Sequence, residues 1–342
     1  MSGRAAIDAV AADARWLAHR FDPDGDRFHM LHVEREHHRA ATFITDEYLP
    51  AGRPLSALPR AALIDAAPQP APLHFIFHSA FCCSTLLARA VDLPGVAMGL
   101  KEPVVLNDLI GWTRRGGDRR LIAQALDHAL TLLARPFEPG EAIVVKPSNI
   151  VNAFASVILA MRAESRALLL HAPLRTYLGS VARKGMWGRL WVRELFVGQA
   201  QDGLLIFDFD QEQYLRQTDL QIAAIGWLAQ HALFQRLTER FGDRVCTLDS
   251  EVLTARPGEA MAALSQLFGL GLDDPAVAAI VAGPAFTRHS KFGQDFAATD
   301  RAEVALQGEA PHTDEIEKVA IWAEAVAASA QIAMVPPAPL IR

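Results

Sequence analysis

Charged side chains directly follow two short apolar runs of the sequence. Lys101 and Glu102 come after the run at 96–100, and Lys146 ends the run at 142–146. Short apolar runs are typical of buried strands, and an open parallel sheet binds its ligands at the carboxyl ends of its strands. A glutamate in such a cleft can take a proton from a hydroxyl or an amine, while a lysine can stabilise negative charge in a transition state. We therefore predict Glu102 as a general base and Lys101 and Lys146 as catalytic cations.

Both assignments have structural alternatives. Glu102 precedes Pro103 and could be an acid at a helix N-terminus, where the helix dipole favours it without any catalytic role. Lys146 could pair with a carboxylate at the edge of the core.

An eight-residue turn at 78–85 joins an apolar strand candidate to an apolar helical pattern. A strand, a tight turn and a helix N-terminus aim backbone N–H groups and the positive end of the helix dipole at one point, so an anion fits there. The alternative is a plain turn in which Ser84 or Thr85 caps the helix. His78 is either a donor to a phosphate or sulfonate oxygen or a strand-end histidine satisfied by the backbone. The turn residues expected to bind the anion are Ser79, Ala80, Phe81, Cys82, Cys83, Ser84 and Thr85.

This turn has the length of the Walker A loop but lacks the key residues of that loop. His78 and Cys83 stand at its glycine positions, and Ser84 stands at its lysine position. An ordinary ATPase is therefore not expected.

Strand candidates alternate with helical segments from residue 73 onward. The helical patterns at 104–113 and 118–135 follow each other without a strand, and 204–209 is either a strand or a connection between helices. Strands that alternate with helices predict a mostly parallel sheet covered on both faces. We therefore predict a three-layer α/β fold of the P-loop kind with a mostly parallel central sheet. Its strand candidates are 73–77, 96–100, 142–146, 166–171 and 244–248.

The first 70 residues follow a different pattern. Apolar positions at helical spacing predict a helix over 5–19, and β-type residues predict a pair of strands over 27–48. Prolines interrupt the stretch 54–72, which is therefore predicted to be a linker or a surface crossing into the main domain. We predict an N-terminal extension over residues 1–70, packed on a main domain over residues 71–342.

Charge and composition narrow the range of partners. The formal net charge of −6 and the pI of about 6.1 offer no global attraction to nucleic acid or to an anionic membrane, so neither is expected as a partner. The three cysteines lack metal-ligand spacing, so we expect reduced thiols. The start of the chain lacks the apolar stretch of a signal peptide, and no later run reaches membrane-spanning length, so a cytoplasmic location is expected. The sequence does not indicate an oligomeric state.

Five segments resemble motifs of the sulfotransferase family, in the order in which the family has them. The turn and the following Ser84-Thr85-Leu86-Leu87 are similar to the loop that binds the 5′-phosphosulfate group, where Lys-Ser-Gly-Thr-Thr precedes a helix. The other segments are 99–103 (Gly-Leu-Lys-Glu-Pro), 145–149 (Val-Lys-Pro-Ser-Asn), 168–180, and 248–257 with 267–270.

The resemblance implies a sulfotransferase-like enzyme that transfers a sulfonate from 3′-phosphoadenosine 5′-phosphosulfate (PAPS) to an acceptor hydroxyl or amine. It implies a small-molecule or peptide acceptor, no metal, and 3′-phosphoadenosine 5′-phosphate as the product of the donor. By similarity, Glu102 is the base, and His171 and Ser180 belong to the site of the 3′-phosphate. The loop at 287–293 occupies the place of the family's basic closing loop, so Arg288 and Lys291 are also expected to contact the nucleotide.

The chain departs from the family's pattern at several positions. Phe81 stands where the family has a loop lysine, and His171 stands where the 3′-phosphate site has an arginine. Ser180 is displaced by one position, and Gly179 fills the usual place of the serine. Two other functions therefore stay open. One is a P-loop kinase-like phosphotransferase, for which Asp208 is the best magnesium ligand; the other is a non-catalytic nucleotide-binding or interaction module that has lost the loop lysine.

Overall fold

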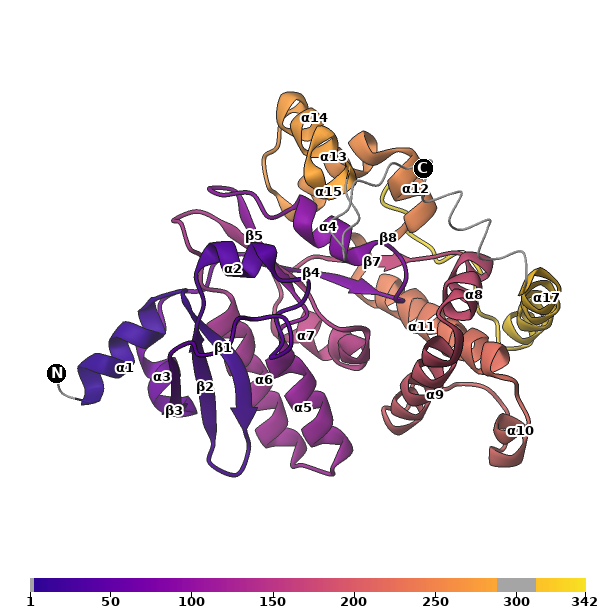
Figure 1. Ribbon diagram of the computed structural model, residues 1–342, viewed down its shortest axis with the longest axis horizontal. Helices are drawn as coiled ribbons and strands as arrows, with labels where there is room; N and C mark the ends of the chain where they lie inside the picture. The colour runs from indigo at the N-terminus through magenta and orange to yellow at the C-terminus, as the bar shows by residue number, and fades with distance from the viewer. Residues whose placement is uncertain (1–2, 288–311) are drawn as a thin grey trace. The chain divides into compact units, whose positions relative to one another are not determined.

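The computed structural model describes residues 3–287 and 312–342. Its architecture is mixed α/β, with a central five-stranded parallel sheet flanked by helices (Figure 1), as the sequence predicts. The strand order is β5-β6-β4-β7-β8. The described residues contain no helix with the length and apolarity needed to cross a membrane.

The chain groups into two compact units that do not follow chain order. Unit 1 is drawn from the ranges 1–76, 85–166 and 268–271, and unit 2 from the ranges 77–84, 167–267 and 272–342. The division into an extension at residues 1–70 and a main domain at residues 71–342 stays a prediction.

Unit 1 holds β5 (Ala97–Lys101), β6 (Ala142–Lys146) and most of β4 (Leu73–His78), all parallel. Every residue of these strands is buried, which is why their sequences are continuous apolar runs and not alternating ones. Lys101 and Lys146 are partners in the register of β5 and β6. The carboxyl ends of these two strands therefore bring the two predicted lysines together.

The helices that follow β4, β5 and β6 in the chain include the two consecutive helices that the sequence predicts. Asp118 begins the second of them, because its side chain accepts hydrogen bonds from the backbone N–H groups of Arg120 and Leu121. The helices are α4 (Ser84–Ala90), α5 (Val104–Arg114), α6 (Arg119–Leu133), the 3₁₀-helix η1 (Asn149–Phe154) and α7 (Ala155–Met161).

The N-terminal part of unit 1 contains a three-stranded antiparallel sheet of order β1-β2-β3 and three helices. The buried guanidinium of Arg135 donates hydrogen bonds of 3.0 Å to the carbonyl oxygens of Val10 and Ala11, so it ties the end of α1 to the residues that follow α6. The elements are α1 (Gly3–Ala12), β1 (Trp16–Asp22), β2 (Arg27–His32), α2 (Arg35–Ala40), β3 (Leu55–Pro59) and α3 (Arg60–Ala66).

Three sequence predictions for this part are wrong. The helix predicted over 5–19 ends at Ala12, and β1 begins only four residues later at Trp16. The second strand predicted within 27–48 is a short helix, α2, and β2 pairs with β1 and β3 instead. The stretch 54–72 is not a linker, because it contains β3 and α3. Pro59 ends the edge strand β3, where a residue without a backbone N–H is tolerated.

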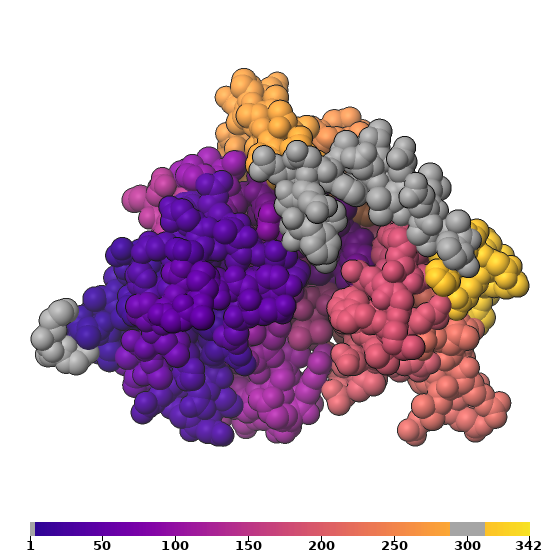
Figure 2. All heavy atoms as spheres, viewed as in Figure 1, coloured from indigo at the N-terminus to yellow at the C-terminus, as the bar shows by residue number. Residues whose placement is uncertain are grey.

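Unit 2 contains the parallel pair β7 (Ala167–His171) and β8 (Val245–Asp249), in which His171 is opposite Asp249. The segment 204–209 is a connection between two helices and not a strand. The short helix α10 that follows it projects at the lower right of Figure 2. The helices are α8 (Leu174–Arg183), α9 (Gly185–Gln201), α10 (Gln211–Leu215), α11 (Asp219–Phe241), the 3₁₀-helix η2 (Gly242–Arg244), α12 (Ser250–Ala255), α13 (Pro257–Phe268), α14 (Asp274–Ala282), α15 (Pro284–Thr287) and α17 (Thr313–Ser329).

The last residues of the chain lie along β8. Thr247 donates its backbone N–H to the oxygen of Ala338 at 2.9 Å and accepts from the backbone N–H of Leu340 at 2.8 Å. The Thr247 hydroxyl also bonds to the Pro337 oxygen at 2.9 Å. Because β8 is the last strand in the sheet order, this segment satisfies backbone groups that would otherwise form an open edge.

Candidate functional site

The loop after β4 has an unusual backbone. Ala80, Phe81 and Cys83 have φ angles of 72°, 51° and 61°. Residues other than glycine rarely adopt this left-handed conformation, which costs on the order of 1 kcal/mol for each of them, and strained residues cluster at ligand sites. A left-handed residue within a turn also aims neighbouring N–H groups at one point, which is how backbone binds anions. The loop conformation therefore suits the anion site that the sequence predicts.

Ser79 and Cys82 attach this loop to the end of β7. The Ser79 N–H donates to the Leu170 oxygen at 3.0 Å, and the Ala172 N–H donates to Ser79 Oγ at 3.3 Å. The Cys82 thiol donates to the same Leu170 oxygen at 3.4 Å. Both side chains are buried, so they hold the loop in place from behind.

His78 closes the loop on itself. It is the buried last residue of β4, and its Nδ1 accepts a hydrogen bond of 3.1 Å from the Ala80 N–H. A ring nitrogen that accepts carries no proton, so the hydrogen of the neutral ring is on Nε2. The backbone contact that the sequence offered as an alternative is thus present, and a donor role for His78 Nε2 stays a prediction.

Ser84 and Thr85 belong to the first turn of α4. Their side chains are buried, and the backbone N–H groups of a first helical turn have no acceptor within the helix. The contact of Ser84 and Thr85 with an anion stays a prediction.

Phe81, at the position of the family's loop lysine, packs against aromatic side chains. The centroid of its ring lies 5.2 Å from that of Trp191 and 5.8 Å from that of Tyr177. Burial raises the pKa of Tyr177. Phe81 is thus part of an aromatic cluster with Trp191 and Tyr177. A lysine at this position could not make the same ring contacts.

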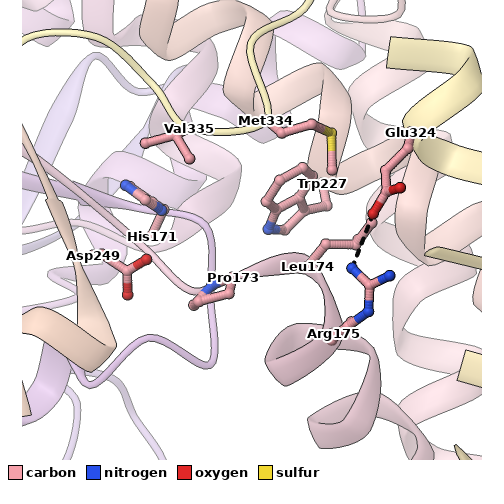
Figure 3. A pocket seen from close by; sticks show the side chains of 9 residues that line it. All are labelled: His171, Pro173, Leu174, Arg175, Trp227, Asp249, Glu324, Met334 and Val335. Carbon is pink, nitrogen blue, oxygen red and sulfur yellow. Dashed lines mark hydrogen bonds and ion pairs between the residues drawn. The ribbon is translucent and has the colours of Figure 1, made fainter. Parts of the chain in front are cut away.

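A cavity of about 500 Å³ opens at the carboxyl ends of β7 and β8 (Figure 3). His171 and Asp249, the last residues of the two strands, line one side of it, and Trp227 lines another. The Trp227 indole N–H donates to the Ala172 oxygen at 2.9 Å, which fixes the ring. In a parallel sheet, this end of the strands is where ligands bind.

The charges of this cavity do not match a phosphate group. Burial lowers the pKa of His171 to about 4 and raises the pKa of Asp249. His171 Nδ1 is buried and has no hydrogen-bond partner among the described residues. Arg175 is held by Glu317 and Glu324 at 2.8 and 2.9 Å. The cavity therefore offers neutral and acidic groups, which suit a base or a sugar better than a 3′-phosphate.

Ser180, also predicted for the 3′-phosphate, does not line this cavity. Ser180 lies on α8, where its Oγ accepts a hydrogen bond of 3.0 Å from Arg183. Arg288 and Lys291 lie outside the described residues. Their nucleotide contacts stay predictions.

Unit 1 brings Lys146 and Glu102 into an ion pair. The Lys146 ammonium contacts Glu102 Oε1, and the Glu102 N–H donates to the Lys146 oxygen at 2.6 Å. Lys146 is 1% exposed, and its ammonium lies 5.2 Å from the centroid of the Phe43 ring, whereas 19% of the Glu102 side chain is exposed. Glu102 also has a left-handed φ of 54°. The carboxylate reaches the surface while its partner does not, which suits a base that must meet an acceptor.

Lys101 is engaged elsewhere in unit 1. Its side chain is fully buried, and its ammonium donates to the carbonyl oxygens of His38 and Arg39 at 2.6 and 3.1 Å. Burial lowers the pKa of Lys101 to about 8, and the nearby Asp92 opposes this shift. Lys101 therefore satisfies carbonyl groups in the last turn of α2. Its catalytic role stays a prediction.

Of the residues that line the cavity at the ends of β7 and β8, His171 was predicted as a site residue from the sequence, whereas the others, including Asp249 and Trp227, were not. Asp249 follows the apolar run at 244–248, which is the same signal that drew attention to Lys101 and Lys146. Within residues 3–287 and 312–342, no group of three or more histidine, cysteine or acidic residues could hold a metal ion.

Comparison with known proteins finds similar solved structures but no matching family. No protein family and no curated protein matches the sequence. The solved structures similar to this one include sulfotransferases. A sulfotransferase from Mycobacterium avium has a TM-score of 0.42 and 13% identity, over 74% of this chain and 78% of that one. The sulfotransferase domain of the curacin biosynthetic pathway has a TM-score of 0.40 and 14% identity, over 67% and 84%.

A third similar structure is the sulfotransferase domain of the olefin synthase from Synechococcus PCC 7002. It has a TM-score of 0.39 and 13% identity, over 66% of this chain and 81% of that one. At such scores the activity has to be argued from the residues of this chain.

Proposed function

We propose that this protein is a sulfotransferase-like enzyme that transfers a sulfonate from PAPS to the hydroxyl or amine of a small-molecule or peptide acceptor. The observation that carries the proposal is the left-handed loop between β4 and α4. It has the position, the length and the following helix of the phosphosulfate loop that the sequence resembles. Its backbone N–H groups would bind the phosphosulfate group of the donor.

In the proposed reaction, the acceptor oxygen or nitrogen attacks the sulfur of PAPS. A bond from the acceptor to sulfur forms, and the bond from sulfur to the bridging oxygen breaks. Its electron pair stays on the 5′-phosphate of 3′-phosphoadenosine 5′-phosphate, which leaves. Glu102 takes the proton of the acceptor, and its loss of charge releases Lys146 to stabilise negative charge.

The cavity at the ends of β7 and β8 is proposed to take the adenosine part of the donor. Its volume of about 500 Å³ is in the usual range for small-molecule sites. Trp227 offers an aromatic wall, and His171 Nδ1 offers a buried polar atom that a ligand could satisfy. Its acidic groups predict that the 3′-phosphate lies outside it.

The first test is calorimetric titration with 3′-phosphoadenosine 5′-phosphate, ATP and ADP. The bisphosphate is expected to bind more tightly than either and to raise the melting temperature, because a ligand of the folded state stabilises that state. Thr85→Ala is expected to weaken this binding. Thr254→Ala is the control, because the Thr254 hydroxyl bonds to its own helix. Preferential binding of ATP would favour the kinase-like alternative.

The second test measures release of the bisphosphate from PAPS in the presence of a broad acceptor mixture. Glu102→Gln is expected to lower turnover while the affinity for nucleotide stays near that of the wild type, because glutamine cannot take a proton. If the wild type binds the bisphosphate but releases none, and only Phe81→Lys shows turnover, the protein is a nucleotide-binding module and not an enzyme.

A further inference from the structure

Lys184 lies beside the anion loop, although about a hundred residues separate them in the sequence. It follows the last residue of α8, and Gly185, with a φ of 57°, turns the chain into α9. The Lys184 ammonium lies 5.5 Å from the centroid of the Phe81 ring and 5.1 Å from that of Trp187. A cation therefore stands over the residue that replaces the family's loop lysine.

Phe81 and Trp187 contact this ammonium, and Trp191 packs against both of their rings. These three aromatic side chains are here called the aromatic seat. The two tryptophan rings are stacked, with centroids 6.2 Å apart and planes at 12°, and the edge of Trp191 meets Phe81 at 5.2 Å. A cation within about 6 Å of a ring centroid is attracted to the face of the ring, most strongly for tryptophan. The seat can thus fix a lysine without neutralising its charge.

Three arginines on α8 and α9 are neutralised by carboxylates, whereas Arg183 donates to the Ser180 hydroxyl. Arg175 pairs with Glu317, Arg189 with Glu315 and Arg193 with Asp219. For Lys184, no acidic residue in the described part of the chain lies within ion-pair distance, and its side chain is exposed. A lysine after α8 also suits the negative end of that helix, but this does not explain the aromatic seat.

We propose that Lys184 is the catalytic cation that the anion loop itself lacks. This inference rests on the proposed sulfonate transfer. As the bond from sulfur to the bridging oxygen breaks and its electron pair moves to the 5′-phosphate, the Lys184 ammonium stabilises the charge on that oxygen and keeps its own proton. Phe81 and Trp187 are then positioning residues, and phenylalanine at position 81 is one wall of a lysine site.

Charge removal at Lys184 is the first arm of the test. Lys184→Met keeps the apolar stem and loses the charge, whereas Lys184→Arg keeps a charge that also binds aromatic faces. Release of the bisphosphate from PAPS is expected to fall by roughly 10²–10³ in Lys184→Met and by less than about tenfold in Lys184→Arg. Lys318→Met is the matched control, because Lys318 is exposed and pairs with Asp314 on α17.

Moving the cation onto the loop is the second arm. Phe81→Lys in the Lys184→Met background is expected to regain turnover by at least about tenfold. Phe81→Lys alone is expected to lower turnover, because it destroys part of the seat and brings two ammonium groups together. A lysine that only stabilised the end of α8 would not produce this reciprocal pattern, which a double-mutant cycle measures.

The outcomes separate this inference from the proposed function. Turnover in Lys184→Met equal to that in Lys318→Met overturns the inference and leaves sulfonate transfer standing. Wild-type protein that does not release the bisphosphate overturns the proposed function. In that case, the assignment of Lys184 is tested by the binding of the bisphosphate, which is monitored through the fluorescence of Trp187 and Trp191. Unchanged affinity in Lys184→Met overturns the assignment of Lys184 as the cation at the loop, and a loss of at least about tenfold supports it.

Discussion

The residues at the strand ends of unit 1 are charged and paired, whereas those of unit 2 are shifted toward their neutral forms. In unit 1, β5 and β6 end in lysines that are buried and fully engaged, Lys146 by Glu102 and Lys101 by the carbonyls of α2. In unit 2, β7 and β8 end in His171 and Asp249, which burial pushes toward their neutral forms. The cation that we propose for the loop of unit 2 is instead Lys184, which is exposed at the junction of α8 and α9.

This difference shows what a charged residue at a strand end can mean. A charge in a buried position must be paired, because the cost of removing it from water exceeds what the fold can tolerate otherwise. A paired charge is less available to a ligand, and an exposed charge on aromatic rings stays available. Position after an apolar run therefore identifies buried ionic groups reliably, but it does not show which of them meet a ligand.

Breaking the pair of unit 1 should give the largest effect on stability. Glu102→Ala leaves the Lys146 ammonium buried without a partner, so the free energy of unfolding is expected to fall by roughly 3 kcal/mol. The double variant Glu102→Gln with Lys146→Met should recover most of this loss, because it removes the charge as well. Urea unfolding measures both.

Asp314→Asn is the control for this comparison. It breaks an ion pair of the surface, with Lys318, and is expected to change stability little. Equal losses in Glu102→Ala and Asp314→Asn would contradict the contrast between buried and exposed charges.

The next largest effect is expected from acid, which should lower the free energy of unfolding through His171 at the end of β7. The pKa of His171 is about 4 in the folded protein and near 6.5 in the unfolded chain. The unfolded chain therefore binds more protons, and the free energy of unfolding falls as the pH falls from 6.5 toward 4. The loss at pH 5 relative to pH 7 is expected to be about 1–2 kcal/mol for this residue.

His171→Gln is expected to show a correspondingly smaller change between urea unfolding at pH 7 and at pH 5. His38 of unit 1, whose pKa burial lowers to about 3, acts in the same direction. His38→Gln therefore measures the contribution of this one histidine of unit 1, and His74, whose pKa burial lowers to about 4, acts in the same direction. A wild-type pH dependence in His171→Gln would show that this histidine is not buried in its neutral form.

The attachment of the loop to β7 should contribute a smaller amount. Ser79→Ala leaves the Ala172 N–H without its acceptor in a buried place, so it should cost about 1–2 kcal/mol and weaken bisphosphate binding. Cys82→Ala removes only a weak thiol donor and is the matched control. Thermal unfolding measures the stability of both variants, and titration measures their affinity for the bisphosphate. Equal changes in Ser79→Ala and Cys82→Ala would contradict the role of Ser79 in attaching the loop to β7.

Relieving the left-handed backbone should give the smallest effect, and it should be stabilising. Cys83→Gly puts a residue without a side chain at a φ of 61°, so the free energy of unfolding is expected to rise by roughly 0.5–1 kcal/mol. Cys83→Ala keeps the strain and controls for the thiol. A loss of stability in the glycine variant alone would show that the loop is not strained at this residue.

The sequence predicted the core strands well, because fully buried parallel strands are continuous apolar runs. The predictions from the sequence were wrong where contacts distant in the chain, or the position of a strand in the sheet, determine the local structure. The polar segment at 35–40 has no apolar periodicity, yet Lys101, distant in the chain, satisfies the last carbonyls of the helix there. The prolines near β3 look like breaks in the sequence, but an edge strand tolerates Pro59 at its end.

For the candidate site, the sequence identified single residues and not their partners. Lys146 and Glu102 were both predicted, but their pairing depends on the register of β5 with β6. The cavity depends in the same way on the register that sets His171 opposite Asp249. The placement of Lys184 beside the loop depends on its contacts with the rings of Phe81 and Trp187, which the sequence alone does not bring together.

The segment at 336–340 has a practical consequence for handling the protein. It hydrogen-bonds to Thr247 on β8, and without it the last strand of the sheet would present unpaired N–H and C=O groups to solvent. Exposed strand edges template pairing between molecules. A chain shortened before Pro336 is therefore expected to self-associate in preparations where the full chain does not, and an affinity tag is better attached to the other terminus.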